Sequence, residues 1–513
     1  MFAVLLALAL AQGPAPGAPI VAIHVVRQEV FDLANPKTSS WPYRTANALH
    51  VLTRERFVRS LLLFREGDPW DPALAAESER LLRATGFLNP VHITARAVEG
   101  GVEVLVETHD QWTTEVSLNY GRMGQRQKAG VSLSEQNFLG WGKTVFLDAR
   151  STPERDSLTL GYTDPLFLGS RFRLEAAHRE ASDGTADAFS LEYPFYALAT
   201  PLAGGVRWRR ESLVEYLWAG GKKAVAGDTL RRSLEAWMGV RLAGDGARTR
   251  RLSFGLFSER AAYARWGFRD GRFYPEPEDR ELAGPWVAFE SLSSQWQVVS
   301  GFRGWWRQED IPLGPDYGLR LGVSFPAFAG RRTVLPFSAS YFRAAFQGRV
   351  YRWLALGTQG RWEAGQARNA VTRLELGTAW VGEQGVRARA VVEVGRRLDL
   401  DQQLTLGANT GLRGYDPDTF DGTSRAVVNL EWRKRLTGEV LHLAVLGVTV
   451  FADAGKTWGA RVGPDTGGWR GDVGVGILGE ITRAAILRVV RLEVAFPDRG
   501  NGPTVLLTGV SLF

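Results

Sequence analysis

From about residue 111 to its end, the chain alternates apolar and polar residues with a period of two. In residues 171–176, Phe, Leu and Ala share one face and charged residues the other, and residues 425–433 repeat this with Val, Leu and Trp. This is the period of a β-strand whose two faces meet different surroundings. The pattern therefore predicts a mainly β fold for residues 111–513.

A soluble β-sandwich and a membrane barrel share this period, because each strand has one apolar and one polar face in both. Three observations favour the barrel. The N-terminus has the pattern of a signal peptide, residues 111–513 show no pattern for a second hydrophobic core, and the apolar face is rich in Trp. A closed barrel also pairs every backbone group in lipid. We therefore expect a transmembrane antiparallel β-barrel.

The N-terminus has a different pattern. Residues 2–11 are apolar and end in the small-x-small sequence Ala9-Leu10-Ala11, which predicts a signal peptide over residues 1–11. This run is too short for a membrane-spanning helix, which needs ~20 apolar residues. Residues 12–19, rich in Pro and Gly, are expected to be a linker.

The segment between linker and barrel mixes helical and strand patterns. Residues 20–30 alternate as a strand, and a helical apolar stripe follows Thr53, a candidate N-cap. A second helix is expected to open at Asp71 with Pro72 in its first turn. Residues 87–97 and 101–108 read as two further strands. The segment is predicted to be a small α+β domain.

Composition narrows the function classes. The 513 residues include no Cys, which excludes a disulfide framework, thiolate metal sites and a lipid anchor on Cys. The net charge of +7 is spread along the chain, whereas a nucleic-acid binder would concentrate it on one module. Scattered arginine suits a polar barrel lumen or a surface facing lipopolysaccharide.

Two stretches late in the chain form a candidate pair, Gly-Leu-Arg-Gly-Tyr-Asp at 411–416 and Phe-Ala-Asp-Ala-Gly at 451–455. An arginine in a long loop, beside a glycine and an aromatic ring, can reach into a barrel. There it can donate charge-assisted hydrogen bonds to an aspartate on the inner wall. We therefore expect Arg413 to pair with Asp453. The alternative is an ordinary hairpin loop and an unrelated turn.

These stretches resemble the R-G-Y/F loop motif and the F-x-D-x-G strand motif of the Omp85 superfamily of outer-membrane assembly and secretion barrels. The resemblance implies a loop lock made of Arg413, Gly414, Tyr415, Asp453 and Gly455. It also implies about 16 strands, although the alternating runs number somewhat more and residues 245–370 match weakly.

Other segments carry the same resemblance. Residues 20–110, with the order β-α-α-β-β, resemble a single POTRA domain, and residues 135–142 resemble the N-x-x-G-x-G turn between early barrel strands. The chain ends on Phe513, as outer-membrane barrels often do. The implied organisation is a periplasmic POTRA domain followed by an outer-membrane β-barrel over residues 111–513.

The resemblance implies a protein of the bacterial outer membrane that is not an enzyme and has no cofactor. It would insert β-barrel proteins into that membrane or translocate proteins across it. Its partners would be unfolded outer-membrane or secreted client proteins, membrane lipid and lipopolysaccharide, and accessory lipoproteins, with no nucleic acid. Clients would add a strand to the POTRA edge and to a seam between residues 113–120 and 504–513. The alternative is a passive porin-like channel with a periplasmic accessory domain.

The sequence motifs that could indicate an enzyme or a metal site are incomplete or lie in the wrong structural context. Residues 474–479 spell G-x-G-x-x-G but lie in an alternating strand, outside any βαβ unit. Asp416, Asp418 and Asp421 suggest a calcium loop, but no glutamate follows at the twelfth position. The six histidines form no H-E-x-x-H pair, and the chain has no G-x-S-x-G elbow.

Overall fold

The computed structural model describes residues 14–123, 126–244, 247–328, 330–484, 489–500 and 502–509. The predicted signal peptide and the terminal Phe513 lie outside these residues. The chain divides into two compact units. The first takes the chain up to Glu115, together with Ser134–Val145 and a short segment that begins at Thr482, and the second takes the rest.

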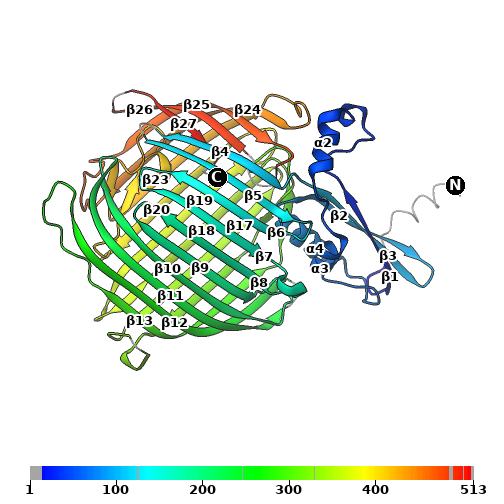
Figure 1. Cartoon of the computed structure of the whole chain (residues 1–513), viewed down its shortest axis with the longest axis horizontal. Helices are drawn as coiled ribbons and strands as arrows, with labels where there is room; N and C mark the ends of the chain where they lie inside the picture. The colour runs from blue at the N-terminus through cyan, green and yellow to red at the C-terminus, as the bar shows by residue number, and fades with distance from the viewer. Residues whose placement is uncertain are drawn as a thin grey trace. The chain divides into compact units, whose positions relative to one another are not determined.

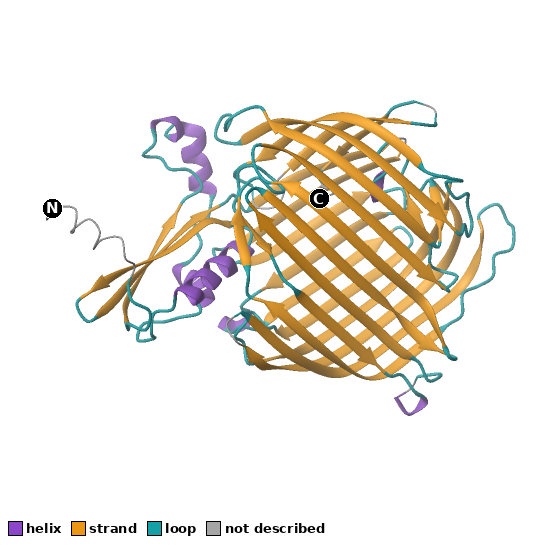
Figure 2. Cartoon of the chain, turned by 180° about the vertical axis from the view of Figure 1, so that it is seen from behind, coloured by secondary structure: helices purple, strands orange, loops and turns teal. Residues whose placement is uncertain are grey.

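The first unit is a three-stranded sheet with three α-helices, seen in blue in Figure 1 and by element type in Figure 2. The strand order is β1-β3-β2, with β1 parallel and β2 antiparallel to the central β3. Phe57, Val58 and Leu82 of the helices and the valines of β3 are all buried and belong to the core. The elements are β1 (Ile20–Gln28), η1 (Pro36–Thr38), α2 (Trp41–Leu49), α3 (Glu55–Leu61), α4 (Pro72–Ala84), β2 (Leu88–Val98) and β3 (Gly101–Asp110).

The helices agree only in part with the sequence prediction. Helix α4 begins at Pro72, and Asp71 caps it by accepting a hydrogen bond from the Ala73 N–H at 2.8 Å, as predicted. The N-cap prediction for Thr53 is wrong, because Arg54 holds that position. Helix α2 was not predicted, and none of its residues is buried in the structure.

Thr53 instead organises a buried polar cluster. Its backbone N–H and Oγ1 donate to Asp110 Oδ2 at 2.8 and 2.7 Å, and its Oγ1 accepts from Asn137 Nδ2 at 2.7 Å. Asn137 Oδ1 accepts from the Gly142 N–H at 2.7 Å. A Cβ at Gly142 would come within 2.1 Å of the Phe57 ring, so only glycine fits there. The N-x-x-G-x-G turn is thereby packed against the start of α3.

The second unit is built on an antiparallel β-barrel, and the structure confirms the predicted fold class (Figure 1). The strands of the closed barrel are β4 (Thr114–Met123), β5 (Arg126–Phe138), β6 (Lys143–Ser151), β7 (Asp156–Asp164), β8 (Arg173–Ala181), β9 (Gly184–Tyr193), β10 (Leu202–Ala219), β11 (Lys222–Gly244), β12 (Arg248–Phe268), β13 (Arg280–Ser293), β16 (Asp316–Gly322), β17 (Leu335–Gln347), β18 (Val350–Glu363), β19 (Gln366–Trp380), β20 (Gln384–Arg396), β23 (Ser424–Arg435), β24 (Ala444–Trp458), β25 (Arg470–Ile481), β26 (Val489–Pro497) and β27 (Thr504–Thr508).

The expected strand count was too low. Twenty strands of the described chain form the barrel, against the prediction of about 16 that came from the family resemblance. The weakly matching region 245–370 holds ordinary antiparallel hairpins, such as β17–β18 with its turn at 348–349. The barrel closes where β27 meets β4, and the described residues pair there as Leu506 with Met123 and Leu507 with Arg122.

The outer face of the barrel exposes many apolar side chains, and the inner face carries ion pairs. On β11 and β12, Leu234, Met238, Phe254 and Leu256 all lie on the exposed face. The inner face carries ion pairs, for example Arg320 with Glu235 and Arg373 with Glu375. This polarity is the reverse of a soluble sandwich and is typical of a barrel in lipid. No helix among the described residues is long and apolar enough to cross a membrane.

Two long connections leave the barrel at opposite ends. We call the end where β4 begins the proximal end and the other the distal end. Residues 294–315 join β13 to β16 at the proximal end and contain β14 (Trp296–Val299) and β15 (Glu309–Pro312). Residues 397–423 join β20 to β23 at the distal end and contain β21 (Leu404–Leu406), η4 (Ala408–Thr410) and β22 (Phe420–Gly422). Two short 3-10 helices, η2 (Phe167–Gly169) and η3 (Pro326–Phe328), lie in other connections.

Candidate functional site

The distal connection 397–423, which we call the distal loop, is packed against the inner wall of the barrel. Leu406, Leu412, Tyr415 and Phe420 form an apolar cluster with Val427 of β23. Leu412 is fully buried, and Arg413 beside it is only 2% exposed. An apolar anchor of this kind holds the neighbouring charged side chain in place against the wall.

Arg413 binds three carboxylates. Its Nε and Nη2 donate to the two oxygens of Asp453, at 2.7 and 3.0 Å, in a bidentate pair. Its Nη1 donates to Glu431 at 3.1 Å and to Glu493 at 3.2 Å. The guanidinium also lies 3.5 Å from the ring centroid of Phe451. One side chain of the loop therefore joins β23, β24 and β26.

The carboxylates around Arg413 have further partners. Arg491 Nη2 donates to both Glu431 and Glu493, the latter at 2.7 Å. Asn429 Nδ2 donates to Asp453 Oδ1 at 2.8 Å. All of these side chains are buried. Because an unpaired buried charge is costly, each member of this network depends on the others.

Two glycines of the predicted motif allow the loop to approach the wall. A Cβ at Gly414 would lie 2.5 Å from the Cβ of Asp472 on β25. A Cβ at Gly455 would lie 2.8 Å from Leu406 Cδ2 on β21. Both distances are shorter than real Cβ contacts, so a larger residue at either position would push the loop away from the wall.

The loop also reaches the strand that closes the barrel. The backbone oxygen of Gly414 accepts a hydrogen bond from Thr504 Oγ1 of β27 at 2.7 Å. The hydroxyl of Tyr415 donates to Asp498, in the connection between β26 and β27, and its ring packs edge-on against Phe420. The tip of the loop is thereby tied to the first residue of β27 and to the connection that precedes this strand.

The base of the distal loop is held by a different part of the wall. Arg361 of β18 donates two hydrogen bonds of 2.7 Å to Asp399. Asp401 accepts from Arg280 of β13 at 3.2 Å and from the hydroxyl of Tyr263 of β12 at 2.8 Å. Burial alone would raise the pKa of Asp401, but its hydrogen bonds with Arg280 and Tyr263 lower it to about 2.

The proximal connection 294–315 also enters the barrel, which the sequence did not predict. Glu480 of β25 accepts from the backbone N–H groups of Trp305 and Trp306. Phe302 packs with Tyr351 and Trp353 of β18. Arg433 of β23 donates to three backbone oxygens, those of Gly301, Phe302 and Arg303, at 2.7, 2.6 and 2.8 Å. We call residues 294–315 the proximal segment.

Strand β23 holds both inserted connections with consecutive inward-facing residues. Asn429 donates to the Gly411 backbone oxygen at 2.6 Å, and Glu431 accepts from Arg413. Arg433, the next inward residue, binds the proximal segment. The two connections therefore meet the same strand at adjacent positions, although they come from opposite ends of the barrel.

The predicted motif residues lie together in the structure: Arg413, Gly414, Asp453 and Gly455. Tyr415 lies beside them, and its hydroxyl donates a hydrogen bond to Asp498. Phe513 lies outside the described residues. Sequence reasoning missed the partners Asn429, Glu431, Arg491 and Glu493. The signal was present for Glu431, a charged residue on the polar face of residues 425–433, but alternation does not say which inward charges meet the loop.

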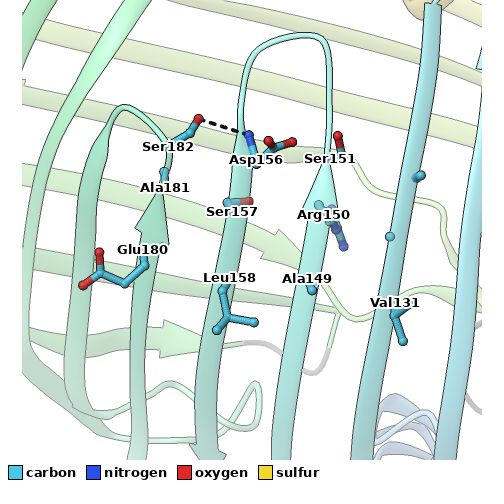
Figure 3. A pocket seen from close by; sticks show the side chains of 12 residues that line it. Val131, Ala149, Arg150, Ser151, Asp156, Ser157, Leu158, Glu180, Ala181 and Ser182 are labelled. Carbon is cyan, nitrogen blue, oxygen red and sulfur yellow. Dashed lines mark hydrogen bonds between the residues drawn. The ribbon is translucent and has the colours of Figure 1, made fainter.

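One pocket of the described chain is an open hollow on the barrel wall. Figure 3 shows this hollow of about 720 Å³ over β5–β8, where Val131 and Leu158 lie among small and polar side chains. The hydrogen bond drawn there runs from the Asp156 N–H to Ser182 Oγ, at 3.2 Å. Among the described residues, no three His, Cys, Asp or Glu are grouped to hold a metal ion.

The fold is similar to those of BamA and CdiB. BamA from Haemophilus ducreyi lacking POTRA domains 1–3 matches with 12% identity and a TM-score of 0.36, covering 95% of this chain and 84% of that chain. CdiB from Acinetobacter baumannii matches with 8% identity and a TM-score of 0.47, covering 96% and 73%. The copper transporter OprC matches with 11% identity and a TM-score of 0.36, covering 77% and 74%.

All three TM-scores are below 0.5, so these likenesses decide neither family nor function. No protein-family model matches the sequence. The search of curated proteins also finds no match. The sequence motifs and the geometry of the barrel interior are therefore the basis for the function proposed below.

Proposed function

We propose that this chain is an outer-membrane protein that inserts β-barrel proteins into the membrane or translocates proteins across it. The observation that carries the proposal is the buried Arg413, which ties the distal loop to β23, β24 and β26. Through Gly414 the same loop touches β27, the strand that closes the barrel against β4. The loop is thus in a position to stabilise the closed barrel.

The chemistry of the proposed action is strand pairing. Separation of β27 from β4 would expose unpaired N–H and C=O groups, which can template the strand of an unfolded client. The distal loop contacts β26 and β27, so its attachment would favour the closed state and its release the open one. No covalent step and no cofactor is needed.

The first unit would receive clients before they reach the barrel. In its sheet, β1 and β2 are the two edge strands. The outer edge of β1 is already bonded at Ile20 to residues 67–68, and that of β2 at Ile93 to Glu79. The stretch of β2 beyond Ile93 is the edge to which a client strand would add. We infer that residues 20–110 act as a periplasmic POTRA domain and that the exposed apolar face of the barrel lies in the outer membrane. Accessory lipoproteins would bind this periplasmic part.

A disulfide across the seam tests the proposal. The chain has no Cys, so Cys at positions 123 and 506, which face each other in the seam register, would form the sole disulfide. We expect the oxidised variant to stop inserting an unfolded barrel client into liposomes and the reduced variant to resume. The matched control places Cys at Thr358 and Thr372, whose hydroxyls are 3.0 Å apart on β18 and β19. Undiminished insertion with the seam locked would refute opening at this seam.

A further inference from the structure

A row of charged side chains crosses the outer face of the barrel from β8 to β13. Residues directly opposite on neighbouring antiparallel strands share a face. The register gives one unbroken row of such partners: His178, Asp187, Arg210, Arg232, Arg260 and Glu281. The three arginines are exposed and stand side by side on β10, β11 and β12. We call Arg210, Arg232 and Arg260 the arginine row.

The arginine row is not neutralised within the protein. Its flanks are paired, since His178 Nδ1 lies 2.6 Å from Asp187 and Arg260 Nε lies 3.2 Å from Glu281. The side chains of Arg210 and Arg232 have no hydrogen bond or ion pair to any residue that the structure describes. Like charges directly opposite on neighbouring strands are destabilising. Two adjacent unpaired guanidinium groups therefore call for an anion from outside the chain.

The row lies at the distal edge of the apolar belt. The next outward row on its proximal side is Phe189, Trp208 and Leu234, which are 41, 37 and 48% exposed. On β12 the outward residues between Arg250 and Arg260 are Leu252, Phe254, Leu256 and Ser258. Ten residues of a tilted strand span about 25 Å of height, which is the thickness of the apolar band of a membrane barrel. The arginine row is therefore at the level of the lipid headgroups.

We propose that Arg210 and Arg232, with Arg260 beside them, bind the phosphate of an anionic lipid headgroup. Neighbouring strands are about 4.8 Å apart, so two guanidinium forks can hold one phosphate between them. The apolar side chains of Trp208 and Leu234, one row closer to the membrane centre, would contact the acyl chains of the same lipid. Free phosphate would lack this second contact. The proposal rests on the proposed function only for the placement of the barrel in a membrane.

Lipid binding to the purified protein in detergent tests the site. The variant Arg210→Gln/Arg232→Gln removes the two unpaired charges. The control Arg250→Gln/Arg352→Gln removes two exposed outward arginines that are not adjacent, near the proximal end. Native mass spectrometry would count bound phosphatidylglycerol, lipid A, phosphatidylcholine and inorganic phosphate. We expect the wild type and the control to retain an anionic lipid on the order of tenfold more strongly than the variant.

Each result either supports the lipid site or overturns it. Comparison of lipid A with phosphatidylglycerol identifies the preferred headgroup, and a preference for either supports the site. Equal binding of phosphatidylcholine, or an equal loss in the control, would overturn it, as would inorganic phosphate binding as strongly as the lipids. The assay contains no client, so a failure of protein insertion would leave this result unchanged. Conversely, the variant can lose lipid while the locked-seam experiment still succeeds.

Discussion

A charged side chain buried inside a barrel is stable only when its partners are complete, and Arg413 of the distal loop is the clearest case here. It is surrounded by Asp453, Glu431 and Glu493, with Arg491 as a second cation. Replacing a buried ionic network by apolar residues can be neutral, but removal of one partner leaves uncompensated charge. The arginine should therefore matter more to the loop's attachment than its single hydrogen bonds suggest.

Arg413→Ala should destabilise the barrel by about 3–5 kcal/mol, because three buried carboxylates would share one remaining arginine. The shift of the thermal unfolding midpoint, read from the gel mobility of the folded barrel, measures this. Client insertion into liposomes should be lost, although the protein is still exported.

Arg413→Lys is the informative companion to this variant. It keeps the positive charge but loses the bidentate fork to Asp453, so it should restore little of the activity. Arg352→Lys is the matched control, since it makes the same change at an exposed arginine of β18. Normal client assembly by Arg413→Ala would remove the basis for the role of the loop lock.

The Asp401 carboxylate at the base of the distal loop should make the stability of the protein depend on pH. Its pKa is lowered from 3.8 to about 2 in the folded protein, so its ionised form stabilises the fold. This contribution is complete above about pH 4 and is lost as the pH falls towards 2. Unfolding midpoints measured between pH 6 and pH 2 should fall in the wild type.

Asp401→Asn should reduce that acid dependence on the order of 2 kcal/mol, because the asparagine has no charge to lose. The two proteins are compared by how steeply their unfolding midpoints fall with pH, so an overall destabilisation of the variant does not affect the comparison. Identical pH profiles of the two proteins would show that Asp401 does not anchor the loop.

At the scale of elements, strands were far easier to predict than the segments that fill the barrel. A strand shows its period in its own residues, as β23 does in residues 425–433. The proximal segment shows nothing comparable, because its backbone oxygens and Trp305 are held by residues such as Arg433 and Glu480, more than a hundred positions away. Helix α2 was also missed, and none of its residues is buried.

The proximal segment should obstruct passage through the lumen. Arg433→Met removes the donor of its three hydrogen bonds to backbone oxygens and should release the segment from β23. Single-channel recordings in planar bilayers should then show larger or more frequent openings than in the wild type. Arg352→Gln, on the outer face of β18, is the control. A conductance that is the same in both proteins would mean that the segment does not obstruct the pore.

For the whole molecule, alternation alone left a sandwich and a barrel open, and the polarity of the interior distinguishes them. Arg320, Glu235, Arg373 and Glu375 face inwards, while Phe254 and its neighbours face outwards. A two-residue period does not specify whether the apolar or the polar face of the sheet lies inside. Only the three-dimensional structure could therefore distinguish the sandwich from the barrel. The strand count failed similarly, because it was borrowed from a resemblance that is weakest over residues 245–370.

The last prediction separates an assembly machine from a channel. Deletion of residues 20–110 removes the edge strands of the first sheet, so client insertion should fall sharply if clients bind there. The conductance of the barrel should stay unchanged, because the inserted loops are held by β10–β27. Asn137→Ala in the full chain is the control, since the deletion also removes its partner Thr53. If insertion were unaffected by the deletion, the first unit would be an accessory to a porin-like barrel.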